Sequence, residues 1–437
     1  MRYSATTPET RRRMLDAIGV RSIDELLQTI PASARSKNAL DVAGPIAEAD
    51  LVQRLEAMKS PRPRVSFVGA GLYSHYVPSP VDSVCARSEW VTSYTPYQAE
   101  LAQGTLAMYY EFQTFMAALT GQEIANGGMY DGSTALVEAV LMAMRIREKA
   151  DPVIWVSRAL HPHYRDTLRT YMQVVGVEIV ELDLDPQSGR TRFPKDTAAL
   201  EKGAAVVLQS PNFLGVVEDL EGLPKGAFKI GVCTEALSMA LLPPLAVDIM
   251  VGDCQSFGIP MQLGGPTAGF FATAKEHVRK LPGRLVGRTV DSQGREAYCI
   301  TLATREQFIR REKATSNICT SSGLMCLRAT VYLSLLGSAG LTRLAEKNAA
   351  VARYVRAGLE AVGLKPVFGG AFFNEFVIDA SAHPRAYERL LEKNIVLGLP
   401  LAESHGLDHH YLVCATELHY AQAQDILAEV QALVRHS

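Results

Sequence analysis

The sequence lacks the cysteine spacing of a disulfide framework or of a zinc site. Its seven cysteines are odd in number, scattered along 437 residues, and never spaced as CxxC. Paired or clustered spacing is what both kinds of site require, and its absence favours a reducing compartment. We therefore expect a cytoplasmic protein that binds no metal.

An excess of charge of one sign is also missing, and so is any long apolar run. Forty-four basic residues face 46 acidic ones, which argues against a basic surface for nucleic acid or anionic lipid. The first 14 residues are polar and carry Arg11, Arg12 and Arg13, unlike a signal peptide. The longest apolar region, residues 236–251, is interrupted by two prolines and is too short to span a bilayer. We expect a soluble globular protein without nucleic-acid or membrane partners.

Short apolar runs alternate with segments of helical periodicity through the middle of the chain. Strands that alternate with helices indicate an α/β domain whose largely parallel sheet is covered on both faces. The predicted strands are residues 153–156, 177–182, 204–208, 229–232 and 248–251, and the predicted helices are 101–119, 134–149 and 164–172.

Three parts are predicted along the chain. Residues 1–65 form a helical arm, in which Ser22 and Glu25 have capping-box spacing and Pro31 stops the helix. Residues 66–325 form the large α/β domain. Residues 326–437 form a smaller C-terminal α/β domain, and a long helical region at 324–336 and 341–362 leads into its strands.

Polar aromatic side chains are concentrated in two loop-like stretches, residues 69–78 and 94–104. Tyrosine, histidine, glutamine and glutamate groups are expensive to bury unless they contact one another or a ligand. A polar turn cluster on the surface is the alternative, because loops can be either variable or functional. Gly69 and Gly71 do not form a dinucleotide fingerprint, since the third glycine is missing.

A glycine-rich stretch, residues 126–134, opens a predicted helix with Gly132, Ser133 and Thr134. Glycines and hydroxyls at a helix N-terminus present backbone N–H groups to an anion, typically a phosphate. An ordinary N-cap at Ser133 or Thr134 is the alternative.

Two further motifs follow predicted strands. His161 and His163 lack the third ligand that a metal needs, which favours a stacking or hydrogen-bonding role for His161. The glycine-rich turn at 253–269 follows a strand, at the edge where a parallel sheet binds its ligands. This layout matches the large domain of fold-type I enzymes of pyridoxal phosphate (PLP), in which the protein supplies a Schiff-base lysine and an acid for the ring nitrogen.

Four runs, GLYSHYVP, YTPYQAELAQGTL, YDGSTALVEA and REKATSNICT, closely resemble the glycine-cleavage P-protein family, glycine dehydrogenase (decarboxylating). The resemblance extends over nearly the whole chain. It is to the N-terminal half of the P-protein, which in many bacteria is a separate alpha subunit, subunit 1. The length of 437 residues suits that separate subunit, because a fused P-protein would need about twice this chain.

The resemblance implies a degenerate PLP site in this chain. The second half of the family carries the cofactor lysine in an HKTFxIP-like segment, whereas the corresponding segment here reads CQSFGIP and places Gln255 at the lysine position. An amide nitrogen does not attack an aldehyde at neutral pH, so no Schiff base can form there. Thr234 stands where the aspartate for the ring nitrogen is expected, with Glu235 beside it. The vestigial pocket then comprises Gly132, Ser133, Thr134, His161, Thr234 and Gln255.

The resemblance also implies the partners. Subunit 2, the beta subunit, would bind PLP covalently and pair with this chain in an α2β2 heterotetramer, which decarboxylates glycine and passes the aminomethyl group to the lipoyl arm of the H-protein. We expect this chain to contribute to the shared active site His75, Tyr76, Tyr94, Tyr97, Gln98, Glu100 and Gln103. Two alternatives are a purely structural partner subunit and an autonomous PLP enzyme using another lysine, such as Lys275 or Lys313.

Overall fold

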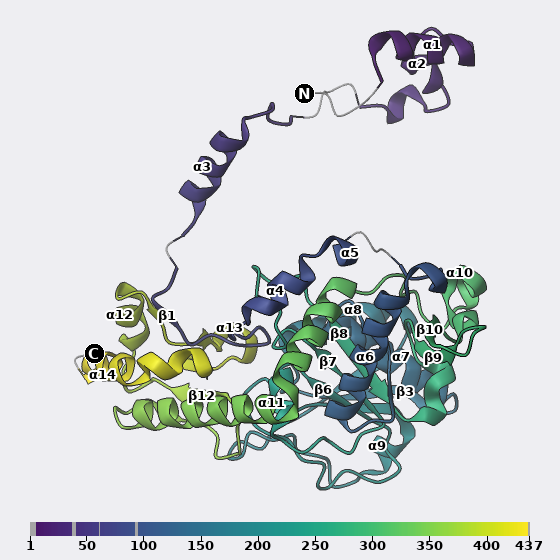
Figure 1. Cartoon of the computed structure of the whole chain (residues 1–437). Coiled ribbons are helices and arrows are strands. Elements are labelled where there is room, and N and C mark those ends of the chain that lie inside the picture. The colour runs from purple at the N-terminus through teal and green to yellow at the C-terminus, as the bar shows by residue number, and fades with distance from the viewer. Residues whose placement is uncertain (1–5, 37–40, 61, 92–94, 436–437) are drawn as a thin grey trace. The chain divides into compact units, whose positions relative to one another are not determined.

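The computed structural model describes residues 6–36, 41–60, 62–91 and 95–435. The chain divides into two compact units, residues 1–62 and residues 63–437, and each is described by itself. Figure 1 shows the helices and strands of both units.

In its described residues the first unit forms short helices: α1 (Pro8–Ile18), α2 (Ile23–Leu26), η1 (Ala32–Ala34) and α3 (Glu48–Met58). Ser22 caps α2, its hydroxyl accepting from the Glu25 N–H at 3.3 Å. The Glu25 carboxylate accepts from the Arg21 N–H instead of from Ser22, so only half of the predicted capping box forms. The prediction that Pro31 ends this helix is wrong, because α2 already ends at Leu26.

The second unit is built on a seven-stranded sheet of order β2-β8-β7-β6-β5-β3-β4. All pairs from β7 to β4 are parallel, which confirms the predicted α/β class with a largely parallel sheet. At the other edge β8 pairs antiparallel with β7, and β2 pairs antiparallel with β8; the sequence analysis predicted neither strand. The strands are β2 (Ile124–Ala125), β3 (Asp151–Ser157), β4 (Glu178–Leu182), β5 (Gly203–Gln209), β6 (Lys229–Cys233), β7 (Ile249–Asp253) and β8 (Gly269–Thr273).

Helices cover both faces of this sheet (Figure 1). Phe271 of β8 packs into the core beneath α7 (Gly132–Ile146) and α8 (Pro162–Val175). Its neighbour Phe270 packs into the core on the opposite face, beneath α6 (Gln103–Thr120) and α11 (Gly323–Glu360). Because successive side chains of a strand point to opposite faces, both faces of the sheet must be apolar, as the uninterrupted apolar runs predicted.

The long helix α11 changes direction at Gly337, whose φ of 60° and ψ of 178° are not helical. This break lies where the sequence analysis separated two helical segments. Among the described residues, α11 is the one helix long and apolar enough to span a membrane, and its apolar side chains pack into two protein cores.

Beyond α11 the chain forms a four-stranded antiparallel sheet of order β11-β12-β15-β14. The buried core of this region includes Val355 of α11 together with Phe376, Val413 and Val430. The elements of this region are β11 (Lys365–Pro366), β12 (Glu375–Asp379), α12 (Ala386–Glu392), β13 (Ile395–Val396), β14 (Leu399–Pro400), α13 (Ala402–His405), β15 (His410–Cys414), η7 (Glu417–Gln422) and α14 (Ala423–Arg435).

The segment from β1 (Val65–Ser66) to α6 links these two sheets. β1 pairs with β13, and the chain then passes the carboxyl ends of β3, β5, β6 and β7 before α6 begins. The elements not yet named are α4 (Ser79–Cys85), α5 (Ser88–Val91), η2 (Ala99–Leu101), α9 (Ala198–Lys202), η3 (Ala236–Ala240), η4 (Lys275–Lys280), β9 (Val286–Val290), β10 (Glu296–Ile300), η5 (Ala303–Arg305), α10 (Gln307–Arg310) and η6 (Arg311–Lys313).

Candidate active site

The N-terminus of α7 is capped by Asp131, not by Ser133 or Thr134 as the alternative interpretation had it. The Asp131 carboxylate accepts from the Thr134 N–H at 2.7 Å and from the Ser133 hydroxyl at 3.0 Å. The Thr134 hydroxyl in turn lies 3.3 Å from the Asp131 N–H, which completes a capping box. A carboxylate at this position satisfies the helix dipole from within the chain.

A second carboxylate fills the space in front of the same helix. Asp253, at the end of β7, accepts from the Gly132 N–H at 3.2 Å. The Tyr164 hydroxyl lies 2.1 Å from the position that a Cβ of Gly132 would take. Burial raises the pKa of Asp253 to about 6. Two carboxylates of this chain therefore accept from the donors at the start of α7 that the sequence analysis assigned to a phosphate.

Gln255 follows Asp253 and is buried, with 2% of its surface exposed. Its carbonyl oxygen accepts from the Tyr73 N–H at 2.7 Å. Its amide nitrogen donates to the Tyr73 carbonyl at 2.9 Å and to the Ile259 carbonyl at 2.8 Å. A carboxamide has two N–H donors, so both are used within this chain.

Thr234 lies at the end of β6 in a chain of hydroxyl hydrogen bonds. Gln209 donates to the Thr234 oxygen at 3.2 Å, Thr234 contacts the Tyr73 hydroxyl at 3.3 Å, and Tyr73 donates to Glu375 at 2.8 Å. The hydroxyl of Thr234 therefore faces a tyrosine of its own chain. Neighbouring Glu235 points elsewhere, toward His75.

His161 N-caps α8 and carries a neutral ring. Burial lowers the pKa of His161 to about 4. Its Nε2 donates to the Ala70 carbonyl at 2.9 Å, while Nδ1 accepts from the His163 N–H at 3.2 Å. Phe213 contacts the ring edge-on with centroids 4.9 Å apart. A Cβ on Gly71 would lie 2.7 Å from Nε2, so residues 70–71 rest directly on the imidazole.

These six predicted pocket residues form one connected network, but their arrangement does not fit PLP. The segment from Gly69 to Tyr73 occupies the space between His161, Thr234 and Gln255, and carboxylates occupy the start of α7. Ring and phosphate would both have to displace parts of the chain that are already hydrogen-bonded.

His75 is buried between two carboxylates, with 3% of its side chain exposed. Nδ1 lies 2.9 Å from Glu417 and Nε2 lies 3.1 Å from Glu235. Burial alone would lower the pKa of His75, but the two carboxylates outweigh it and raise the value to about 10. Both ring nitrogens are used within this chain, which argues against the predicted direct contact of His75 with a partner's site.

The predicted contact residues that follow are divided between exposed and internal positions. Tyr76 is 63% exposed and Tyr97 is 49% exposed, and Gln98 and Glu100 are exposed as well. Gln103 is half-buried, donating to the Ala99 and Tyr298 carbonyls and accepting from the Tyr298 N–H at 2.9 Å. It therefore holds the loop to β10, and its amide is not available for a partner. Tyr94 lies outside the described residues.

A cavity of about 390 Å³ lies between α5, α6 and the start of α11. The sequence analysis assigned no site residue here, although the REKATSNICT run leads directly into its hydroxyl-rich wall. Behind that wall Arg284 is buried, with its guanidinium donating to the Cys319 carbonyl at 2.9 Å and lying 5.8 Å from the Tyr97 ring centre. The lining residues are Trp90, Val91, Thr105, Met108, Tyr109, Pro266, Thr320, Ser321, Ser322, Gly323, Leu324, Met325 and Leu327.

Metal-ligating side chains are not clustered in the described part of the chain. No group of three or more His, Cys, Asp or Glu residues there could hold a metal ion. The two alternative cofactor lysines are surface residues: Lys275 and Lys313 are both exposed.

Solved structures with similar folds define the class of protein. Sphingosine-1-phosphate lyase of Burkholderia pseudomallei superposes with a TM-score of 0.64, covering 93% of this chain and 95% of that one, at 14% identity. Glutamate decarboxylase of Lactobacillus brevis gives 0.67 over 92% and 96%, also at 14%. At this identity the likeness is one of fold, that of fold-type I PLP-dependent enzymes, which confirms the predicted class.

Closer relatives identify the family. The glycine cleavage system P-protein model matches residues 1–431, and the chain belongs to that family. It is similar to the probable glycine dehydrogenase (decarboxylating) subunit 1 of Solibacter usitatus (45% identity, 96% of this chain and 94% of the relative) and of Anaeromyxobacter dehalogenans (46%, 96% and 97%). A crystal structure of inhibitor-bound glycine decarboxylase (P-protein) covers 100% of both chains at 39% identity with a TM-score of 0.87. The resemblance noted in the sequence is confirmed.

Proposed function

We propose that this chain is the alpha subunit of a glycine-cleavage P-protein and that it does not anchor PLP. In this proposal it is active only with a lysine-bearing beta subunit, in a cytoplasmic α2β2 heterotetramer. The complex decarboxylates glycine and transfers the aminomethyl group to the lipoyl arm of the H-protein. One observation supports this most directly: Gln255 stands at the lysine position and is fully hydrogen-bonded to Tyr73 and Ile259.

The surface side chains of this chain support a shared active site. The phenols of Tyr76 and Tyr97, with the Gln98 amide, are exposed hydrogen-bond donors that a partner's site could use. The apolar wall of the neighbouring cavity, including Trp90 and Leu324, would exclude water from a lipoyl arm that enters beside them. Glu100 would orient these donors.

The test compares the isolated chain with the reconstituted pair. Purified alone and supplied with PLP, the chain should show no visible absorbance of covalently bound pyridoxal and no exchange of CO2 with the glycine carboxylate. Adding the beta subunit should produce both. Absorbance from the isolated chain that borohydride fixes onto one of its own lysines would overturn the proposal and favour the autonomous enzyme. The exposure of Lys275 and Lys313 argues against that alternative.

A further inference from the structure

The segment Ala70–Tyr76 is held at nearly every residue by side chains from distant parts of the chain. Glu375 accepts from the Ala70 N–H at 2.6 Å, and His161 donates to the Ala70 carbonyl. Thr416 donates to the Ser74 carbonyl at 2.8 Å. Hydrogen bonds to residues 161, 375 and 416, three separate parts of the chain, leave this loop little conformational freedom.

Gln255 contributes the two bonds at the centre of this segment. Its carboxamide pairs with both backbone groups of Tyr73, as a neighbouring strand would. A lysine in this place has three donors and no acceptor, so it could not accept from the Tyr73 N–H. Glutamine can pair with both the N–H and the carbonyl of Tyr73, which accounts for a glutamine at position 255.

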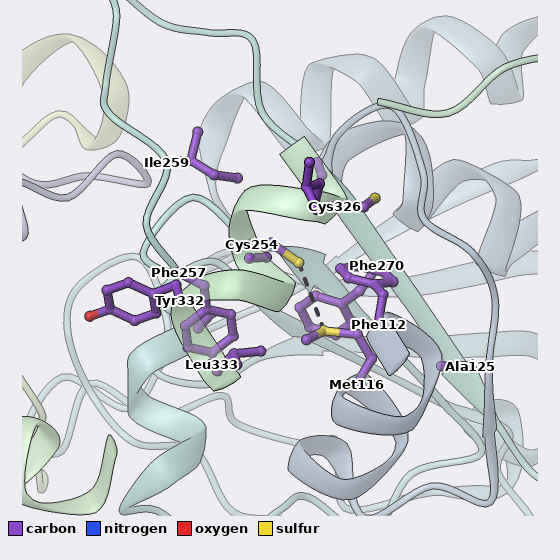
Figure 2. Close-up of a cluster of buried hydrophobic side chains, with 14 of the residues drawn as sticks. Phe112, Met116, Ala125, Cys254, Phe257, Ile259, Phe270, Cys326, Tyr332 and Leu333 are labelled. Carbon is purple, nitrogen blue, oxygen red and sulfur yellow. Dashed lines mark hydrogen bonds between the residues drawn. The ribbon is translucent and has the colours of Figure 1, made fainter. Parts of the chain in front are cut away.

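The backbone on either side of Gln255 is held in place by the packing of its neighbours in the core. Figure 2 shows Cys254 and Phe257, which lie one residue before and two residues after Gln255, among the buried side chains of α6 and α11. Cys254 contacts the Met116 sulfur at 3.8 Å, and Phe257 stacks on Tyr332 with ring centres 6.3 Å apart. Because the backbone of Gln255 is fixed, its carboxamide fixes the position of Tyr73 in the loop.

Tyr76 is where the held segment reaches the surface. Glu417 accepts from the Tyr76 N–H at 2.7 Å and from His75 at 2.9 Å, so the backbone of Tyr76 is fixed while its side chain is 63% exposed. Glu417 also accepts from Asn348 of α11 at 2.9 Å. The exposed phenol of Tyr76 is therefore attached to a backbone that Glu417 holds in place.

We propose that Gln255 is a positioning residue. Together with His161 and Thr234 it binds the loop Ala70–Tyr76 and so fixes the position in which Tyr76 is presented to the shared active site. This inference rests on the proposed function, in which Tyr76 contributes to that site. In this proposal the pocket binds the segment Ala70–Tyr76 of its own chain in place of PLP.

The first measurement is hydrogen exchange on the isolated chain carrying Gln255→Leu. The Tyr73 amide should exchange at least about tenfold faster than in the wild type, the factor that corresponds to one lost hydrogen bond. Gln113→Leu is the matched control, because buried Gln113 pairs in the same way with the Val286 N–H and carbonyl, at 2.9 and 3.0 Å. It should leave the Tyr73 amide unchanged. Equal Tyr73 protection in both variants would overturn the proposal.

The second measurement is glycine–CO2 exchange after reconstitution with the beta subunit. Gln255→Leu should lower turnover about 10- to 100-fold below Gln113→Leu, since a misplaced contact of about 1 Å has effects of this size. Equal turnover would refute the positioning role. If the wild-type pair itself shows no exchange, it is the proposed function that fails.

A milder variant keeps the test decisive if Gln255→Leu does not fold. Gln255→Met keeps the length of the side chain and removes both of its hydrogen bonds to Tyr73, so Tyr73 exchange and turnover should change as expected for Gln255→Leu. Wild-type behaviour in both assays would contradict the inference.

Discussion

At the residue scale, Tyr97 is an exposed phenol whose ring is held from two sides. Phe308 contacts it edge-on with centroids 5.2 Å apart, and Arg284 lies over the ring. Tyr97→Phe keeps both ring contacts and removes only the hydroxyl. We expect turnover of the reconstituted complex to fall about tenfold, the effect of one hydrogen bond, without loss of association as measured by sedimentation.

Tyr171→Phe provides the control for this substitution. Tyr171 lies on α8 and is also 49% exposed. It should leave turnover unchanged. If Tyr97→Phe has no effect either, Tyr97 makes no contact in the shared site, and the purely structural role of this subunit gains support.

Glu375 gives the chain a pH dependence that can be isolated. Burial raises its pKa to about 7, above the unfolded value, so between about pH 4.5 and 7 the folded state binds the proton more tightly than the unfolded state. Its contribution to stability therefore falls by roughly 3 kcal/mol as pH rises through this window. Glu375→Gln should flatten that part of the curve, measured by urea unfolding at several pH values. A slope identical to the wild type would contradict the pKa assignment.

The sequence indicated which residues lie near the candidate site, but it did not indicate which of them form hydrogen bonds within the chain. The missing amine at Gln255 is visible from the sequence, because chemistry follows directly from residue type. The internal roles of His75 and Gln103 are not, since their partners Glu417 and Tyr298 lie 342 and 195 residues away. No local pattern records such contacts.

At the scale of secondary structure, periodicity located the strands and helices that are apolar throughout. The predicted helices at 101–119 and 164–172 correspond to α6 and α8, and the predicted runs at 204–208 and 229–232 to β5 and β6. β8 was missed because Gly269–Thr273 follows directly on a glycine-rich turn and reads as part of it. Boundaries also shifted where a cap was misjudged, as with Asp131 at the start of α7.

The break in α11 supplies a prediction at this scale. Gly337 has a φ of 60° and a ψ of 178°, a region that side chains with a Cβ rarely enter. Gly337→Ala should destabilise the protein by about 1–3 kcal/mol, measured by chemical unfolding. Gly104→Ala is the control: Gly104 lies within α6 with no atom near its would-be Cβ, and should gain about 0.5–1 kcal/mol. Equal stability of the two variants would show that α11 tolerates a Cβ at its break.

At the scale of the whole molecule, the α/β class followed from strand and helix alternation, and the family from four short runs. What remained hidden was how the loop at 69–76 relates to the C-terminal sheet. β1 pairs with β13, and Thr416 and Glu417 hold Ser74, His75 and Tyr76 from the opposite end of the sequence. Contacts of this kind depend on the path of the complete chain, which patterns within short windows do not encode.

The contacts around Gln255 bear on whether a single substitution could create a cofactor site. A lysine placed at position 255 would still have the Tyr73 backbone beside it, and Asp253 would still accept from the first N–H group of α7. Under the proposed function, the need for a beta subunit therefore rests on several contacts of this chain and not on the residue type at position 255 alone.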